Sequence, residues 1–494
     1  MTEEETADAA ARADEAMPSH APRTRRFLVI LGLCIAFALA ALAGARAIFG
    51  RRPPGRWEKK AWPSGPVPVP VAHYSEATPE NITDVLAGAK PGDTIMLAPG
   101  DYSSPGAISL NGAPGAPITL KAEGGAIFKP GLSVTKSSWL ILDGLIIDGA
   151  GLSAKDRSGR MGLMISECGY CVLRRLTIRG IPGRYGIYGN NLHHTIIEDS
   201  NVSHIATGHG ICVFGASSDL IIRRNRVYDC ASCGIYVDAY TVPGAAVTHV
   251  LAEANTIART GAEGGAAFNC SNVVQSCFRN NLVYDNFAGG ICFYKSPQDP
   301  AITSALRAAR PRPRIPSALL NRILDRILNR PSPDCANNVV LGNTVYFPPG
   351  QGRWSFKLRD ESTGFMVHNN IFVGGSYGTV SISRESLAGL AMDYNLITTH
   401  PGQVLLGEHY TADNEPTFEY TVGSWQATGC DAHSLFDRDP AFHAAQQGDF
   451  RLDRNSPAID AGKRLHRWLH YDIDGLTRDR GDSPDCGAFE YPTP

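Results

Sequence analysis

The chain has 494 residues, of which 43% are hydrophobic and 19% are charged. This composition excludes a disordered chain, a collagen and a coiled coil, and the length suffices for one large domain or two ordinary ones. The 46 basic and 48 acidic residues leave a formal net charge of −2. Because no global basic field is present, we do not expect the chain to bind nucleic acid.

An uncharged run of apolar and small residues at 27–45 is long enough to cross a bilayer, and residues 47–49 extend it. We predict a single membrane anchor at 27–49, with residues 1–26 as a disordered cytoplasmic tail and the C-terminal domain on the periplasmic or extracellular side. A cleaved signal peptide is the alternative. The run is long for such a peptide, however, and the arginines that follow it make a poor cleavage site. Residues 50–70 hold six prolines and are predicted to form an extended linker.

A short pattern recurs along the chain, in which a polar residue, usually Asn, precedes a β-branched or apolar pair. The Asn positions are Asn225, Asn255, Asn281, Asn343, Asn370 and Asn395, at steps of 30, 26, 62, 27 and 25 residues. Steps near 25 residues indicate one coil per repeat. Strands this short cannot bury their faces alone, so we expect them to stack in parallel. The Asn column is expected to lie at a turn, where side-chain amides bond to neighbouring coils and tolerate left-handed backbone.

Three segments at the start of the repeats carry a resemblance to a known fold. They read PGDTIMLAPGDY at 91–102, APITLKAEGGAIF at 116–128 and WLILDGLIIDG at 139–149. The chain from 78 to 400 resembles the right-handed parallel β-helix superfamily, typified by pectate lyases, and these segments resemble the opening coils of the chondroitinase B and alginate lyase group. The resemblance implies an all-β protein with a right-handed parallel β-helix solenoid, which we place at 71–430.

The two ends of the solenoid are predicted to be covered. A capping helix is expected to begin with Thr78 as N-cap and to bury Ile82 and Leu86 on one face. From residue 449 the sequence resembles the closing segment of many secreted bacterial β-helix proteins, so 431–494 is predicted to cap the last coil. Arg478 is expected to hold the clustered aspartates there, with Ca²⁺ binding as the alternative.

The 62-residue step contains an insertion at 296–335, with many arginines and with apolar residues at helical spacing. It predicts an amphipathic helix on the flank of the coils, and a basic lid over an anionic substrate or a membrane contact are the alternatives. Eleven cysteines follow the predicted anchor. They are interpreted as buried thiols or as disulfides, since the two CxxC pairs lie on different coils and have no His at ligand spacing.

A Gly-rich second strand follows each repeat, and side-chain alternation predicts its outward face. Neighbouring coils lie about 4.8 Å apart, so the outward residues are expected to form one polar, aromatic surface that could hold a sugar chain. The predicted substrate-binding residues there are Tyr188, Asn190, Tyr236, Asn269, Tyr294 and Lys295. The predicted catalytic residues are Lys357, Arg359 and Asp238.

A uronate lyase must neutralise the C6 carboxylate, remove the C5 proton and expel the glycosidic oxygen. Lys357 is the predicted base and Arg359 the predicted neutraliser, while Asp238 and Glu263 could recruit Ca²⁺. The sequence therefore predicts a membrane-anchored envelope protein that acts on an anionic, uronate-containing polysaccharide by β-elimination. A non-catalytic carbohydrate-binding or surface-assembly protein and a glycosidase or epimerase on the same scaffold remain alternatives.

Known catalytic motifs are incomplete in this chain. The segment GHGI at 208–211 is similar to a short polygalacturonase motif with a catalytic His, but the NTD segment and paired DD of that family are absent. We therefore predict that His209 is a turn residue. The pectate lyase WIDH and the epimerase YGFDPHD are also absent, so the reaction does not follow from the resemblance alone.

Overall fold

The computed structural model describes residues 73–153, 161–239, 242, 244–295, 334–409, 416–478 and 480–492. The predicted tail, anchor and linker at 1–70, and the insertion up to residue 333, lie outside these ranges. Within them, no helix is long and apolar enough to span a membrane. The anchor, the location of the domain and the helix in the insertion therefore stay predictions.

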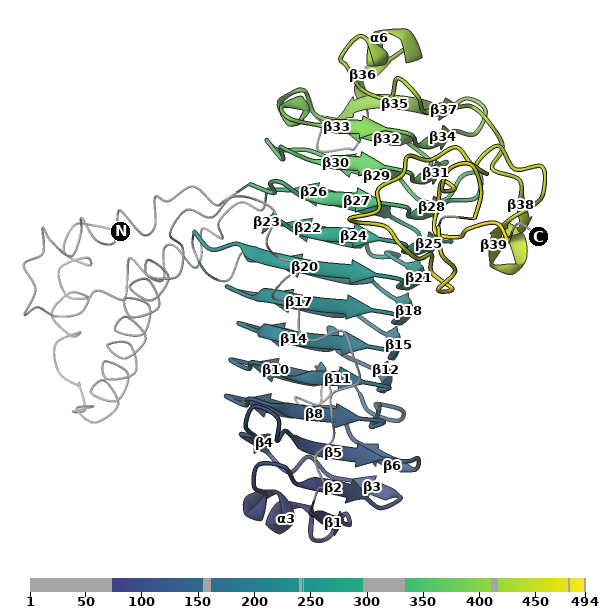
Figure 1. Cartoon of the computed structure of the whole chain (residues 1–494). Helices are drawn as coiled ribbons and strands as arrows, with labels where there is room; N and C mark the ends of the chain where they lie inside the picture. The colour runs from purple at the N-terminus through teal and green to yellow at the C-terminus, as the bar shows by residue number, and fades with distance from the viewer. Residues whose placement is uncertain are drawn as a thin grey trace, which may run out of the picture. The chain divides into compact units, whose positions relative to one another are not determined.

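The described chain winds through three long sheets, to each of which almost every coil adds one strand (Figure 1). All strand pairs within them are parallel except one antiparallel pair at the end of the third sheet, between strands Val404–His409 and Pro416–Tyr420. Sheet A contains β1 (Tyr74–Ala77), β2 (Thr94–Leu97), β5 (Ile118–Ala122), β8 (Leu140–Asp143), β11 (Val172–Arg174), β14 (His193–Glu198), β17 (Ser218–Arg223), β20 (Val247–Glu253), β23 (Val273–Val274), β24 (Cys277–Arg279), β27 (Val339–Leu341), β30 (Met366–His368) and β33 (Ala391–Asp393).

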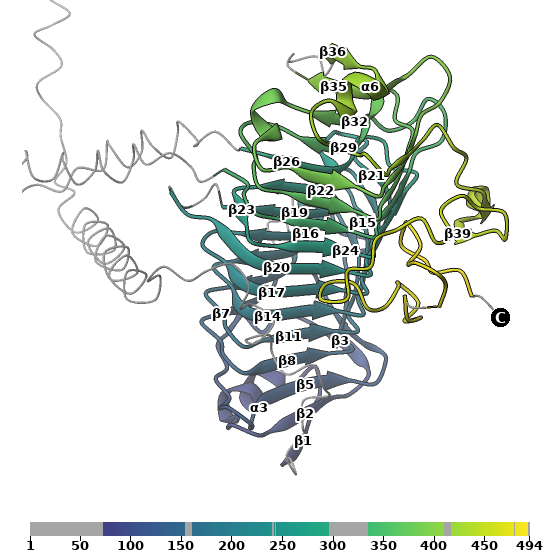
Figure 2. The same ribbon diagram turned by 45° about the horizontal axis from the view of Figure 1, so that its top comes forward.

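Sheets B and C complete each coil, and Figure 2 shows successive strands of sheet C following one another along the solenoid. Sheet B contains β3 (Gly100–Tyr102), β6 (Ala126–Phe128), β9 (Ile146–Asp148), β12 (Thr177–Ile181), β15 (Asn201–Ile205), β18 (Arg226–Cys230), β21 (Thr256–Thr260), β25 (Leu282–Tyr284), β28 (Thr344–Tyr346), β31 (Ile371–Val373), β34 (Leu396–Thr398) and β37 (Leu435–Phe436). Sheet C contains β4 (Ala107–Ile108), β7 (Leu132–Thr135), β10 (Met161–Ser166), β13 (Tyr185–Asn190), β16 (His209–Phe214), β19 (Ile235–Asp238), β22 (Ala266–Ser271), β26 (Gly289–Tyr294), β29 (Trp354–Leu358), β32 (Gly378–Ile382), β35 (Val404–His409) and β36 (Pro416–Tyr420).

The hydrophobic core lies inside the coils, where equivalent side chains of successive coils stack. In sheet A, for example, Leu142, Leu173, Ile197 and Ile222 are paired in register and at most 2% exposed. Full burial of one such side chain stabilises the fold by roughly 1.5–3 kcal/mol. The eleven cysteines of the described residues are all buried and free. Of the two interpretations of the cysteines, the structure shows buried thiols.

The Asn column lies at the turn between sheets A and B, as predicted. The Asn281 side chain donates to the carbonyl oxygen of Ala252 and to Oδ1 of Asn343, both at 2.9 Å. Its own Oδ1 accepts from Asn255, so each side chain links neighbouring coils. The left-handed residue is the one before the Asn, such as Asn280 with φ of 54°. The Asn side chains thus satisfy buried backbone groups at a turn that sheet hydrogen bonds cannot reach.

The N-terminal helix caps the first coils, but it begins later than predicted. Helix α3 spans Ile82–Gly88 and has Asn81 as its N-cap. Thr78 lies in the preceding turn, where its backbone N–H donates to the Asn81 side chain at 2.7 Å. The predicted apolar face is correct, because Ile82 and Leu86 are buried against the core.

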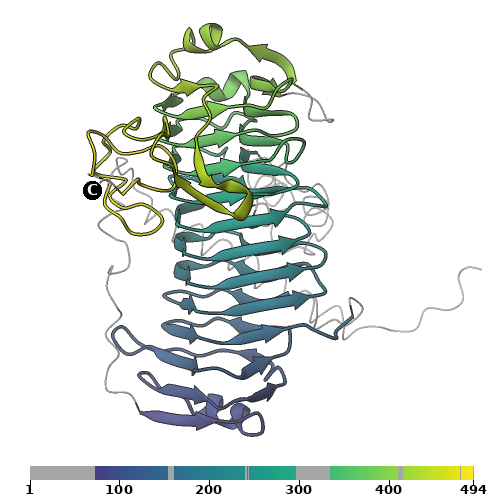
Figure 3. The same cartoon turned by 90° about the vertical axis from the view of Figure 1, so that its right-hand side faces the viewer.

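The C-terminal segment differs from the predicted cap, since it covers a flank of the solenoid (Figure 3). The last coils are followed by β36 and by helix α6 (Val422–Gln426), whose Trp425 is buried and donates to Asp431 at 2.8 Å. Beyond β37 the chain turns back, forms the hairpin of β38 (Phe442–Ala444) and β39 (Asp449–Leu452) with the short helix η4 (Ala445–Gln447) between them, and packs Leu469 on outward apolar residues of sheet A. The remaining short helix, η3 (Arg384–Leu387), follows β32.

Arg478 anchors this flank segment, but the carboxylate that it pairs with is Glu490 and not one of the predicted aspartates. It is 2% exposed and donates to Asn280 Oδ1 at 2.8 Å and to Glu490 Oε2 at 3.4 Å. Asp472 and Asp485 accept backbone N–H groups of the same segment. These carboxylates therefore already have structural partners.

Candidate functional site

Two columns of outward side chains run along sheet C, one and three residues after a column of core residues. The core column is fully buried and consists of Ile187, Ile211, Ile235, Phe268, Ile291 and Phe356. The first outward column consists of Tyr188, Cys212, Tyr236, Asn269, Cys292 and Lys357. The second consists of Asn190, Phe214, Asp238, Ser271 and Tyr294. The structure thus places seven of the predicted site residues on one face.

Four of these residues form a chain of hydrogen bonds. Asn269 Nδ2 donates to the Tyr294 hydroxyl at 2.8 Å, which donates to the Tyr236 hydroxyl at 3.4 Å, which donates to Asp238 Oδ2 at 2.7 Å. Asp238 is fully buried. Burial, assisted by the negative charge of Asp238, raises the pKa of both tyrosines well above the ordinary value. Both hydroxyl groups therefore keep their protons at neutral pH.

The two predicted catalytic cations lie on the coil after Tyr294. Lys357 of β29 is 8% exposed, and burial, assisted by the positive charge of Arg359, lowers the pKa of its amine to about 8. Arg359 follows β29 directly, and its guanidinium lies 5.3 Å from the centre of the Tyr294 ring. Arg359 Nε is also 3.0 Å from Asp360 Oδ2 on the surface. An amine of lowered pKa and a guanidinium over the Tyr294 ring thus lie on the coil adjacent to that tyrosine.

Two predicted site residues, Lys295 and Glu263, do not belong to this group. Lys295 follows β26, and its amine lies 2.7 Å from Asp334 and 3.4 Å from Glu361. The hydrogen bond to Asp334 raises the pKa of Lys295. Glu263 is exposed and precedes β22, whereas Asp238 ends the neighbouring strand β19, so the two carboxylates lie at opposite ends of parallel strands.

Within the described ranges, no group of three or more His, Cys, Asp or Glu side chains could hold a metal ion. Asp238 and Glu263 lie apart on neighbouring strands, and the recruitment of Ca²⁺ to a substrate carboxylate stays a prediction.

His209 lies on strand β16 and on the outward face, so its interpretation as a turn residue was wrong. Its ring lies 5.6 Å from that of Tyr185 and 5.2 Å from that of Tyr236, and its Nδ1 accepts the backbone N–H of Cys233 at 3.1 Å. Burial lowers the pKa of His209 to about 4, so the ring is neutral with its proton on Nε2. The alternation of side chains fails at His209 because the next two residues, Gly210 and Ile211, both face the core. A Cβ atom on Gly210 would lie 2.3 Å from the Val227 side chain.

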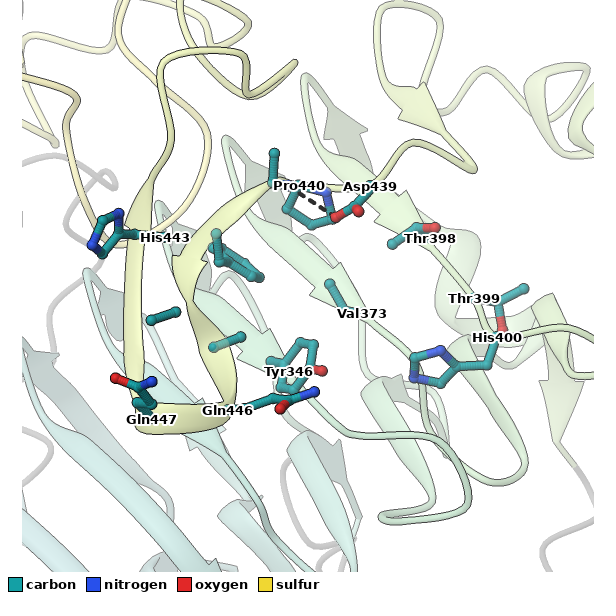
Figure 4. A pocket seen from close by; sticks show the side chains of 14 residues that line it. Tyr346, Val373, Thr398, Thr399, His400, Asp439, Pro440, His443, Gln446 and Gln447 are labelled. Atoms are coloured by element: carbon teal, nitrogen blue, oxygen red, sulfur yellow. Dashed lines mark hydrogen bonds between the residues drawn. The ribbon is translucent and has the colours of Figure 1, made fainter.

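A cleft of about 610 Å³ lies on a different part of the molecule (Figure 4). It is lined by Tyr346, Thr398 and His400 on the sheet B side and by the β38–η4 segment with Asp439 on the other. These residues are neither on sheet C nor close in sequence to Lys357. The residues that the sequence predicted thus do not line this cleft. The outward face of sheet C is the better candidate, because burial lowers the pKa of the Lys357 amine there and the Arg359 guanidinium of the same coil lies over the Tyr294 ring.

Comparisons with known proteins agree with the fold. A family described as "right handed beta helix region" matches residues 130–304. No match was found among curated protein sequences. A lacto-N-biosidase from Eubacterium ramulus is similar over 74% of this chain and 68% of its own, with 11% identity and a TM-score of 0.50.

Two further structures are similar at lower scores. A pectate lyase is similar over 86% of this chain and 98% of its own, with 13% identity and a TM-score of 0.47. The A-module of a mannuronan C-5 epimerase from Azotobacter vinelandii is similar over 66% and 84%, with 14% identity and a TM-score of 0.44. At such identities the likeness concerns the fold alone. The three parallel sheets show a parallel β-helix fold, and the family match identifies residues 130–304 as similar to a right-handed β-helix region.

Proposed function

We propose that this protein is a polysaccharide lyase that cleaves uronate-containing chains by β-elimination at the outward face of sheet C. The observation that carries the proposal is a buried lysine, Lys357, whose pKa is lowered to about 8, on the same coil as a guanidinium held over a tyrosine ring. At neutral pH roughly a tenth of such an amine is unprotonated and can act as a base. The predicted anchor at 27–49 would tether this activity to the cell envelope.

The reaction follows from the charges of three side chains. Arg359 pairs with the C6 carboxylate of the substrate, which replaces the exposed Asp360 as its partner and makes the C5 proton more acidic. The neutral Lys357 amine takes the C5 proton, and the electron pair of that C–H bond forms the C4–C5 double bond. The C4–O bond breaks, and the leaving oxygen takes the proton from the Lys357 ammonium. The amine is then neutral again, so atoms and charge balance.

The tyrosine hydroxyl chain has a binding role in this scheme. Tyr294, on the coil adjacent to Lys357, and Tyr236, three coils from Lys357, stay protonated and present hydroxyl groups to the bound sugar chain, and Asp238 fixes their direction through Tyr236. Asn269 fixes the other end of the chain. Hydrogen bonds that are already formed cost little reorganisation when the substrate binds.

The test is to incubate the full-length protein with alginate, pectate and glycosaminoglycans, with and without Ca²⁺. Ultraviolet absorbance from unsaturated uronate ends is followed together with a reducing-end assay. Absorbance that rises in step with reducing ends supports elimination. Reducing ends without absorbance would identify a glycosidase, and altered uronate composition without new ends would identify an epimerase. Binding without either change would favour a non-catalytic carbohydrate-binding protein.

Two variants assign the activity to the site. Lys357→Met removes the base and is expected to abolish the absorbance signal. Lys90→Met removes an exposed lysine at the other end of the described chain and is expected to act like the wild type. Full activity in a folded Lys357→Met protein would reject the assignment of the base.

A further inference from the structure

The cleft beside sheet B lies between two parts of the chain that are far apart in sequence (Figure 4). One wall is the outward side of sheet B, where Tyr346, Val373 and Thr398 are paired in register on β28, β31 and β34. The other wall is the segment 439–447, which leads into β38 and forms η4. The cleft volume of about 610 Å³ falls within the range of about 300–1,000 Å³ that is typical of small-molecule sites. All 14 lining residues belong to the described ranges, so both walls are fully described.

Aromatic packing holds the two walls together at one end of the cleft. Tyr284 and Tyr346 are paired in register on β25 and β28, and the Phe450 ring of β39 lies 5.0 Å from the first ring and 5.2 Å from the second. Phe442 of β38 lies 6.0 Å from the Tyr346 ring and almost perpendicular to it. The next outward residue of this column, Val373, is smaller than a tyrosine, so the hairpin that rests on the two tyrosine rings leaves a space beside β31 and β34.

Hydrogen-bonding side chains line both walls of this cleft. Tyr346 and Thr398 supply hydroxyl groups on the sheet B side, and the Gln446 side chain extends from the hairpin toward Tyr346 in Figure 4. Hydroxyl and primary amide groups can each donate and accept hydrogen bonds. Burial, assisted by the negative charges of Asp285 and Asp439, raises the pKa of Tyr346, so its hydroxyl keeps the proton that it can donate.

Asp439 brings a carboxylate of fixed direction to the cleft. Its side chain is exposed, and its Oδ1 accepts the backbone N–H of Ala441 at 2.9 Å. Hydrogen bonds that a carboxylate accepts from the hydroxyl groups of a ligand are stronger than those between neutral groups. The same negative charge would repel a carboxylate or phosphate group of a ligand.

We propose that this cleft binds a neutral saccharide. A sugar ring carries hydroxyl groups around its edge that both donate and accept, and the C–H groups on its faces pack against aromatic rings. The cleft supplies the rings of Tyr346 and Phe442 beside an amide, hydroxyl groups and a fixed carboxylate. Tyr346 lies on sheet B and Lys357 on sheet C of the same coil, so the site is separate from the proposed lyase face and does not depend on that function.

The test adds neutral tetrasaccharides of glucose, galactose, mannose and N-acetylglucosamine to the full-length protein at millimolar concentration, with tetragalacturonate as the acidic comparison. Saturation-transfer difference NMR measures binding, and hydrogen exchange locates it. We expect at least one neutral tetrasaccharide to bind and to slow amide exchange in residues 398–400 and 439–448. Tetragalacturonate is expected to leave exchange in these two segments unchanged, even when it binds at sheet C.

Two variants assign the binding to the cleft. Asp439→Asn removes the charge but keeps an oxygen for the backbone hydrogen bond, and it is expected to weaken binding about tenfold. Tyr346→Phe keeps the ring packing and removes the hydroxyl, with an expected loss of affinity of about fivefold. Asp101→Asn and Tyr74→Phe alter exposed residues near the other end of the described chain, and these matched controls should bind like the wild type.

Three results would overturn the proposal. They are no binding of any neutral tetrasaccharide, binding that leaves exchange in both segments unchanged, and unchanged affinity in folded Asp439→Asn and Tyr346→Phe proteins. Slower exchange in these segments with tetragalacturonate, at an equal or lower concentration, would overturn the choice of a neutral saccharide. None of these measurements involves cleavage, so a failure of the proposed lyase function is seen separately, in the absorbance assay.

Discussion

Replacing Lys357 by methionine is expected to stabilise the fold at neutral pH. Burial lowers the pKa of this amine from 10.5 to about 8. At about 1.36 kcal/mol for each pH unit, the difference of about 2.5 units corresponds to about 3 kcal/mol. This free energy opposes folding while the amine is charged, and methionine fills a similar volume without a charge to bury.

The pH dependence gives the sign of this effect. Below pH 8 the amine is protonated in both the folded and the unfolded chain, so the full cost of burying the charge is present. Between pH 8 and 10.5 the folded protein loses the proton first, and the free energy of unfolding of the wild type therefore rises with pH. Lys357→Met lacks this rise, so its advantage is largest at pH 7 and vanishes near pH 10.5.

Denaturant unfolding of the wild type, Lys357→Met and Lys90→Met at pH 7 and pH 10 checks this prediction. Tryptophan fluorescence can follow the transition, and the exposed Lys90 is expected to make no difference. A Lys357→Met protein that is less stable than the wild type at pH 7, or that keeps the wild-type rise with pH, would refute the reasoning. Lys357 would then be a structural residue.

Three other changes have expected outcomes. Arg359→Gln should lower kcat/KM about 100-fold in the elimination assay and change thermal stability little, since its pair with Asp360 is exposed. Tyr236→Phe removes a 2.7 Å hydrogen bond to the buried Asp238, and thermal unfolding should show a loss of about 1–3 kcal/mol. Burial raises the pKa of Glu490 to about 7 and that of Asp485 to about 6, so the flank segment should lose stability as pH rises from 4.5 to 7. This loss should be visible as faster hydrogen exchange, corrected for its intrinsic rate. Glu490→Gln should weaken the dependence, most clearly between pH 6 and pH 7.

The repeat spacing predicted the coils because each coil repeats one local solution. Asn255 and Asn281 lie where the 26-residue step placed them, and their amides bridge coils in register. Alternation likewise placed Tyr188, Tyr236 and Lys357 on one face, because strands of one sheet keep a common register once their core residues stack.

The sequence could not predict contacts between distant segments or local breaks in alternation. Lys295 is paired with Asp334 across the insertion, which no local pattern indicates. His209 turned outward because the two residues after it both face the core. The C-terminal segment lies on the flank because sheet A carries apolar residues on its outer side, and Leu469 packs there.

The most direct test of the account is ultraviolet absorbance from unsaturated uronate ends, measured for the full-length wild type and for Lys357→Met on the same set of polymers. The account predicts that absorbance rises with the wild type, increases in rate as pH approaches 8, and is absent with the variant. A folded wild-type protein that generates no unsaturated ends on any uronate polymer, or a variant as active as the wild type, would contradict it.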